Sequence, residues 1–122
     1  MRYLFLVCLF LFASSVHGGN MAERAEALFD EDWQWRLEHA PEFATSIGDL
    51  RFDTTLSDTS AAASRAALAH QRAMLDQARA IERDKLPSDV QLSYDVFVFD
   101  KEQLVKGASF YPLMAQPITA YH

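Results

Sequence analysis

The chain has 122 residues, a formal net charge of −6 at pH 7 and one cysteine, and half of its residues are hydrophobic. An acidic chain without a cluster of lysine and arginine argues against nucleic acid and anionic membrane surfaces as partners. A single cysteine cannot form a disulfide framework, and by its length the chain is one domain.

Residues 1–18, MRYLFLVCLFLFASSVHG, have the composition of a secretory signal peptide. One basic residue, Arg2, precedes an apolar run over residues 3–13, and small or compact residues, Val16 and Gly18, occupy the third-last and last positions of the segment. The apolar run is too short to span a bilayer, which needs about 20 residues. Cys8 lies inside this run, whereas a lipoprotein signal would place its cysteine directly after a small-residue box at the cleavage site.

The segment therefore predicts export with cleavage after Gly18, to the periplasm or the medium. A retained membrane anchor is the alternative. After cleavage, residues 19–122 contain no cysteine, and no membrane association is expected of them.

The first helix is predicted over residues 21–40. Asn20, followed three residues later by Glu23, fits a capped helix start. Apolar residues then recur at spacings of three and four, which indicates one buried stripe: Ala25, Leu28, Phe29, Trp33, Leu37 and Ala40. Trp35 lies off this stripe, so we expect the helix to be covered on more than one side.

A short second helix is predicted over residues 41–47. Pro41 cannot continue the first helix but suits the first position of a new one. Gly48 supplies a left-handed cap at its end. Phe43 and Ile47, four residues apart, are expected to form its buried side. Residues 49–57 follow as a polar connector.

A third helix is predicted over residues 59–84, starting near Ser57 to Ser60 and stopping before Leu86 and Pro87. Its apolar face is rich in alanine, which implies a close approach to another helix. The residues on that face are Ala63, Ala67, Leu68, Met74, Leu75, Ala78 and Ile81.

A fourth helix is predicted over residues 88–106, with Ser88 as the cap and Gln91 as its partner. The run VFVF at 96–99 has strand character, but the flanking cap and a helical spacing decide for a helix that ends at Gly107. The residues with that spacing are Val90, Tyr94, Phe97, Lys101 and Leu104. The sequence thus predicts an all-α fold of antiparallel helices.

Residues 107–122, GASFYPLMAQPITAYH, are expected to form an irregular apolar tail. Large apolar residues occur there without a helical period, interrupted by Pro112 and Pro117. Such a segment should lie against other protein surface. We therefore expect the natural polypeptide to continue beyond His122, with residues 19–122 as the amino-terminal helical segment of a larger domain.

The polar residues do not form a recognised catalytic or metal-binding sequence pattern. His39, near a helix end, favours a structural role beside the helix dipole. His70 has no histidine or cysteine three or four residues away, as a zinc site on a helix would want. His122 is the last residue of the sequence, and no role is assigned to it.

Other candidates also favour structural interpretations. The acidic residues of the first helix indicate a solvated face: Glu23, Glu26, Asp30, Glu31 and Asp32. Ser46 and Ser93 have no His/Asp partners in a triad pattern, and no glycine-rich phosphate loop occurs. Tyr94 and Asp95 are expected to form an internal hydrogen bond. We predict no catalytic, cofactor-binding or metal-binding residue in this chain.

One combination of segments is more specific. WQWRLEHAPEFATSIGDLRFD (33–53), an Ala/Arg-rich helix and LPSDVQLSYDVF (86–97), followed by an apolar Pro-containing segment, resembles the amino-terminal part of the bacterial domain of unknown function 885 family. The resemblance covers nearly all of residues 19–122. Trp33, Pro41, Phe43, Gly48 and Asp49 match the first signature, and Tyr94 and Asp95 match the second.

The resemblance implies an exported, largely helical protein of the zinc-metallopeptidase kind, several times longer than this chain. In such a protein a zinc-bound water attacks a peptide carbonyl with a glutamate as general base. The family's metal motif, His-Glu followed by Pro-Gly-His-His, lies far downstream, and neither part occurs here. No metal or catalytic residue of the family therefore transfers onto this chain.

Two hypotheses follow. In the first, the chain is an amino-terminal scaffold or lid that packs on the remainder of its own polypeptide, with a peptide as the substrate of the whole protein. In the second, it is a complete small periplasmic helical module that binds a partner and has no enzymatic activity.

Overall fold

The computed structural model describes residues 21–110, and all regular structure in this range is helical. The elements in chain order are α1 (Met21–His39), α2 (Pro41–Ser46), η1 (Leu50–Phe52), α3 (Ala61–Arg79), η2 (Arg83–Lys85), α4 (Ser88–Gly107) and η3 (Ala108–Phe110). The predicted all-α fold is confirmed. Asn20, the proposed cap of the first helix, and the apolar tail beyond Phe110 lie outside the described residues.

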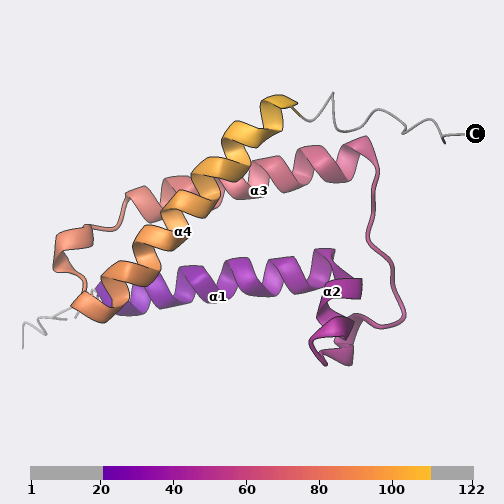
Figure 1. The fold of residues 1–122 in the computed structure, drawn as a ribbon, viewed down its shortest axis with the longest axis horizontal. Coiled ribbons are helices and arrows are strands. Elements are labelled where there is room, and N and C mark those ends of the chain that lie inside the picture. The colour runs from indigo at the N-terminus through magenta and orange to yellow at the C-terminus, as the bar shows by residue number, and fades with distance from the viewer. Residues whose placement is uncertain (1–20, 111–122) are drawn as a thin grey trace, which may run out of the picture.

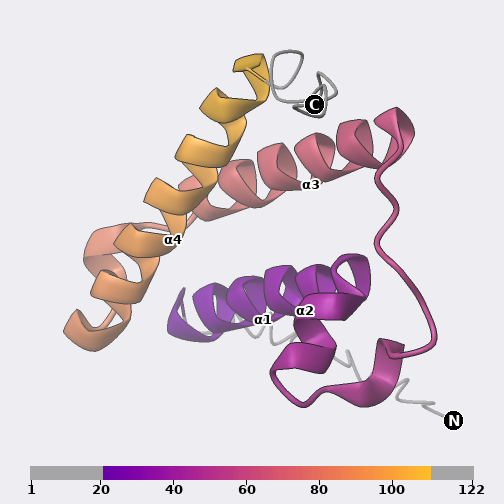
Figure 2. The same cartoon turned by 45° about the vertical axis from the view of Figure 1, so that its right-hand side comes forward.

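Three long helices make up the frame of the molecule (Figure 1). α1 and α3 lie side by side and run in opposite directions, and α4 returns across α3 from the end at which α3 finishes. α2 and η1 form a compact pair of short helical segments at the carboxyl end of α1, which we call the α2–η1 corner. An extended linker leads from it to the start of α3 (Figure 2).

The core lies where the three long helices meet. It contains mainly small and aliphatic side chains: Ala25, Leu28, Met74, Ala78, Ile81, Leu86 and Tyr94. Alanine at position 78 lets α4 approach closely enough for the Tyr94 hydroxyl to donate to the Ala78 carbonyl at 3.0 Å. The predicted close approach at the alanine-rich face is therefore confirmed, and the VFVF run lies in α4.

The turn after α2 is built as the sequence predicts, with a glycine in the left-handed region. Gly48 has φ +89 and donates to the Thr45 carbonyl, while the Asp49 N–H reaches back to Ala44. This pair of bonds is the Schellman motif, which satisfies carbonyls at the end of a helix.

The predicted buried side of α2 is wrong. Ile47 is more than half exposed and Phe43 is partly exposed, whereas Pro41 and Ala44 are buried. α2 is a short helix that leaves α1 at an angle, so its buried side is the side that faces α1. The small residues on that side allow the two backbones to approach.

The third and fourth helices differ at their ends from the prediction. α3 stops at Arg79 rather than near residue 84, and the chain turns so that Ile81 and Leu86 both enter the core. The N-cap residue of α4 is Pro87 rather than Ser88. The side-chain amide of Gln91 donates to the backbone carbonyl of Leu86 at 2.9 Å. The predicted reciprocal Ser88–Gln91 cap does not form, because Ser88 is already inside the helix.

None of the helices within residues 21–110 is both long and apolar enough to cross a membrane.

Candidate functional site

Asp32–Arg36 of α1, which reads DWQWR, is a densely connected stretch of the described residues. Each of its side chains contacts another element or a neighbouring turn, through hydrogen bonds, ion pairs or ring contacts. α1 presents these five residues around its whole circumference, because consecutive helical residues are 100° apart. The stretch therefore contacts α3, α4, α2 and η1 at once.

An ionic cluster formed by Asp32, His70 and Lys101 joins the three long helices. Oδ1 of Asp32 lies 3.0 Å from Nε2 of His70 on α3, and Oδ2 lies 2.5 Å from Nζ of Lys101 on α4. The exposed fractions of the three side chains are 14%, 11% and 5%, respectively. A lysine buried to this extent needs a nearby carboxylate, so Asp32 compensates the buried charge of Lys101.

The surroundings of Lys101 are also favourable to a cation. Its Nζ lies 5.0 Å from the centre of the Phe97 ring and 3.5 Å from a carboxylate oxygen of Asp100. An ammonium group over an aromatic face is attracted by the ring quadrupole. Next to the cluster, the buried Oε1 atom of Gln71 has no hydrogen-bond partner in the described structure.

A stack of three rings runs from His70 of the ionic cluster to His39 at the carboxyl end of α1. The indole of Trp35 lies between the imidazoles of His39 and His70, with centroid distances of 4.0 Å on both sides and interplanar angles of 13° and 9°. Nδ1 of His39 lies 2.9 Å from the Trp35 carbonyl oxygen. Contact with α3 on this side confirms that α1 is covered on more than one side.

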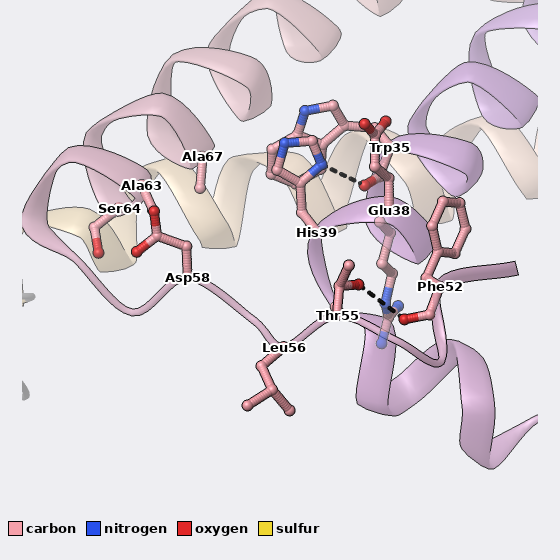
Figure 3. Close-up of a pocket in the computed structure, with 12 residues that line it drawn as sticks. Trp35, Glu38, His39, Phe52, Thr55, Leu56, Asp58, Ala63, Ser64 and Ala67 are labelled. Carbon is pink, nitrogen blue, oxygen red and sulfur yellow. Dashed lines mark hydrogen bonds between the residues drawn. The ribbon is translucent and has the colours of Figure 1, made fainter. Parts of the chain in front are cut away.

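A pocket of about 560 Å³ opens at the His39 end of the stack (Figure 3). Trp35 and His39 lie on one side of it, and Leu56 and Asp58 of the linker lie on another. Nδ1 of His39 bonds within its own helix rather than to the carboxylate of Glu38 or Asp58.

A groove between α1 and α4 runs past the ionic cluster. Two adjoining hollows, of about 470 and 560 Å³, share the lining residues Phe29, Asp32, Phe97, Asp100 and Lys101. Trp33 and Leu104 lie at one end of the groove, and both are exposed although the spacing predicts them to be buried. α1 and α4 diverge here, which leaves these large side chains without a covering element in the described residues.

The α2–η1 corner at the carboxyl end of α1 is held together by polar contacts. Arg51 forms a forked pair with Asp49, at 2.6 to 3.1 Å, and donates to Gln34 of α1 at 2.9 Å. The hydrogen bonds from Arg51 lower the pKa of Asp49. Glu42 accepts bonds from the side chain and backbone of Ser57, which lower its pKa and fasten the linker to α2.

Several residues singled out in the sequence have structural roles. Ser46 caps its own helix by donating to the Phe43 carbonyl at 2.7 Å. Tyr94 forms the expected internal hydrogen bond, donating to the Ala78 carbonyl, whereas Asp95 forms a two-pronged pair with Arg83 at 2.6 Å. Ser93 is exposed. His122 lies outside the described residues.

The interpretation of Asp32 as part of a solvated acidic face is wrong. The other acidic residues of α1 are exposed, but Asp32 points between α3 and α4. A signal for this was present in the sequence. Asp32 lies seven residues after Ala25 and four after Leu28, which is a position on the apolar stripe.

Within residues 21–110, no group of three or more His, Cys, Asp or Glu side chains is arranged so that it could hold a metal ion. The two histidines in this range, His39 and His70, stack on the two sides of Trp35. The carboxylate of Asp32, which bonds to His70, is the oxygen donor beside them. This donor set does not fit a zinc centre, which needs three or four converging ligands.

Comparison with known proteins returned no match: neither a family model, nor a curated protein, nor a solved structure matches the chain.

Proposed function

We propose that this chain is the amino-terminal scaffold or lid of an exported, zinc-dependent peptidase-like hydrolase, and that it is not catalytic on its own. The observation that carries the proposal is the groove between α1 and α4. Large aromatic and aliphatic side chains line it beside a buried ion pair. A surface of this kind is ordinarily covered by other protein, and the remainder of the same polypeptide is the covering element we propose.

The residues that carry the family resemblance support an architectural role. Trp33 contacts Phe43 edge to face, with ring centroids 5.9 Å apart, and Gly48 and Asp49 end the turn that follows. The guanidinium of Arg36 lies 4.4 Å from the centre of the Phe43 ring. These contacts fix the angle between α1 and α2, so the stretch WQWRLEHAPEFATSIGD has a structural reason to be specific.

The proposed hydrolase would hold its zinc downstream of this chain, at a His-Glu and Pro-Gly-His-His motif, because the donor set of residues 21–110 does not fit the metal. Zinc would supply a bound water or hydroxide as the nucleophile. Residues 1–18 would direct export and be removed after Gly18, which places the protein in the periplasm or the medium. We name no residue of this chain as catalytic, cofactor-binding or metal-binding.

The test uses the reading frame and a metal titration. We expect the frame to continue past codon 122 and to encode the His-Glu and Pro-Gly-His-His motif. Equilibrium dialysis should show about one zinc ion bound to the whole product, as expected for a single catalytic site, and no stoichiometric zinc on residues 19–122. A continued frame without the motif, or stoichiometric zinc on residues 19–122, would contradict the proposal.

The second candidate is a complete small periplasmic helical binding module, and the pocket of Figure 3 favours it. The pocket is in the size range of small-molecule sites and has aromatic walls from Trp35 and Phe52. A stop codon after His122, together with a single cooperative thermal transition for residues 19–122, would decide for this candidate and against the scaffold.

A further inference from the structure

One of the two hollows in the groove is lined by all three long helices. Its volume is about 470 Å³, and its lining residues come from α1 and α4, with Gln71 from α3. Trp33 of α1 and Leu104 of α4 lie at one end of it, and these two large side chains are 41% and 46% exposed. We call this space the three-helix hollow.

The three-helix hollow has a buried hydrogen-bond acceptor in its lining. Oε1 of Gln71 is buried and has no hydrogen-bond partner within the described residues, whereas buried polar groups are nearly always bonded. The ammonium group of Lys101, which has three donors, also lines the hollow. It forms one hydrogen bond within residues 21–110, to Asp32, and the carboxylate of Asp100 lies 3.5 Å away. The covering segment should therefore be apolar and should offer a donor to Gln71.

A segment of extended main chain has these properties. Each residue other than proline has one N–H donor and one C=O acceptor, and in an extended chain both can bond to groups outside the segment. A helix laid over the hollow would use these groups internally. It would leave the Gln71 oxygen to a side chain, so an extended chain fits the hollow better.

Residues 111–122, YPLMAQPITAYH, meet these requirements by their sequence. They contain no Asp, Glu, Lys or Arg, and Pro112 and Pro117 oppose a helix. Leu104 lies six residues before Phe110, which is about 10 Å along the helical segments α4 and η3. Twelve extended residues reach up to about 40 Å, so this segment is long enough to turn back and pass Leu104 and Gln71.

We propose that residues 111–122 turn back after Phe110 and lie extended in the three-helix hollow, with a main-chain N–H bonded to Oε1 of Gln71. The inference rests on the proposed function, because it names the part of the same polypeptide that first covers the groove. The apolar side chains of the segment then cover Trp33 and Leu104, and its main chain satisfies the buried acceptor.

The first experiment is disulfide trapping in the protein expressed from its complete reading frame. Residues 19–122 contain no cysteine, so introduced pairs have no competing thiol in that range. L104C is combined in turn with L113C, M114C and I118C, because neighbouring side chains of an extended segment point to opposite sides. At least one pair should close within a single chain under mild oxidation, since a disulfide needs Cα atoms within about 7 Å.

L56C provides the matched control for the trapping. Leu56 is an exposed leucine of the linker and does not line the three-helix hollow. Combined with the same three cysteines, L56C should form much less intramolecular disulfide than L104C. Mass spectrometry of digested protein measures the disulfide fraction in each variant, and circular dichroism checks that each variant is folded.

The second experiment tests the bond to Gln71 by hydrogen exchange. In Q71M, amide exchange within residues 113–121 should be roughly tenfold faster than in the parent, as expected when a buried hydrogen bond is lost. Methionine has a similar shape to glutamine but lacks the carbonyl oxygen. Q77M changes an exposed glutamine of the same helix and should keep the parent's exchange rates.

Four results would overturn the proposal. No L104C pair closes, L56C traps the segment equally well, the disulfides join two copies rather than one chain, or Q71M exchanges at the parent's rate. The zinc titration measures a different property. A product that binds zinc but traps no segment contradicts this inference alone, whereas a trapped segment in a product without zinc contradicts only the proposed function.

Discussion

Asp32 is a side chain that bonds to both of the other long helices. Its two oxygens bond to His70 of α3 and Lys101 of α4, so it links residues that are far apart in the sequence. The Lys101 side chain is almost fully buried and depends on this carboxylate for its compensation. The loss of Asp32 should therefore cost more than the loss of an exposed acidic residue of α1.

The first prediction concerns this pair. D32N should lower the free energy of unfolding by about 2 kcal/mol or more, because it leaves the buried Lys101 with only the more distant and more exposed carboxylate of Asp100. The double variant D32N/K101M should be more stable than D32N alone, since methionine retains much of the lysine volume without the charge. Urea denaturation of both variants measures these differences.

Glu31 provides the control for this prediction. It precedes Asp32 on α1 and is exposed, so E31Q should change the stability by no more than about 0.5 kcal/mol. Equal effects of E31Q and D32N would show that Asp32 does not support the buried charge. A double variant as unstable as D32N would lead to the same conclusion.

At the scale of the elements, the turn after α2 is the feature that depends most on one residue. Gly48 has φ +89, a conformation that is unfavourable for any residue with a Cβ atom. A Cβ at this position would meet no atom within 4 Å, so backbone strain is the only penalty of a substitution. The position therefore isolates the cost of the left-handed turn.

The second prediction compares two glycines. G48A should destabilise the protein by about 1–2 kcal/mol through backbone strain. G107A is the matched control, because Gly107 lies at the end of α4 in helical conformation and also has open space around it. This change should be neutral or stabilising by up to about 1 kcal/mol. Thermal unfolding of both variants gives the comparison, and equal effects would contradict it.

The elements also show how far the sequence determines the structure. The four helices and the Gly48 turn were predicted, because helical periodicity, proline and glycine act locally. The end of α3 and the cap of α4 were not, because core burial of Ile81 and Leu86 decides where the chain turns. Local propensity alone would continue α3 through Ala80 and beyond.

The ionic cluster could have been found from the same periodicity. Asp32, His70 and Lys101 each occupy a position on the apolar face of its helix, at spacings of three, four or seven from buried residues. Three polar residues on the core faces of three helices suggest that they meet. Which of them pair, and at which level, depends on how α1, α3 and α4 cross, and the sequence does not state those angles.

At the scale of the whole molecule, exposed ion pairs and hydrogen bonds hold the peripheral segments to the frame. Arg83 of η2 pairs with Asp95 of α4, Arg51 pairs with Asp49, and Glu42 accepts from Ser57 of the linker. In each case hydrogen bonding to these partners lowers the pKa of the carboxyl group. These carboxylates are thus favoured in the charged form when the protein is folded.

The third prediction follows from the sign of these shifts. A carboxyl group whose pKa is lower in the folded state stabilises the fold above its unfolded pKa, here 3.8 for aspartate and 4.5 for glutamate. That stabilisation is lost as the pH falls through the folded value. The urea midpoint should therefore be constant near neutral pH and fall below about pH 4.5, in keeping with the ordinary carboxyl range.

A triple variant, E42Q/D49N/D95N, should show a smaller fall of the midpoint between pH 6 and pH 3 than the parent protein. The midpoint at pH 7 should be lower in the variant, because its neutral amides bond less strongly to Arg51, Arg83 and Ser57. D30N, on the exposed face of α1, serves as the control and should keep the parent profile. If the triple variant has the same pH profile as the parent, these three contacts do not govern acid stability, and the interior cluster at Asp32 becomes the group to test next.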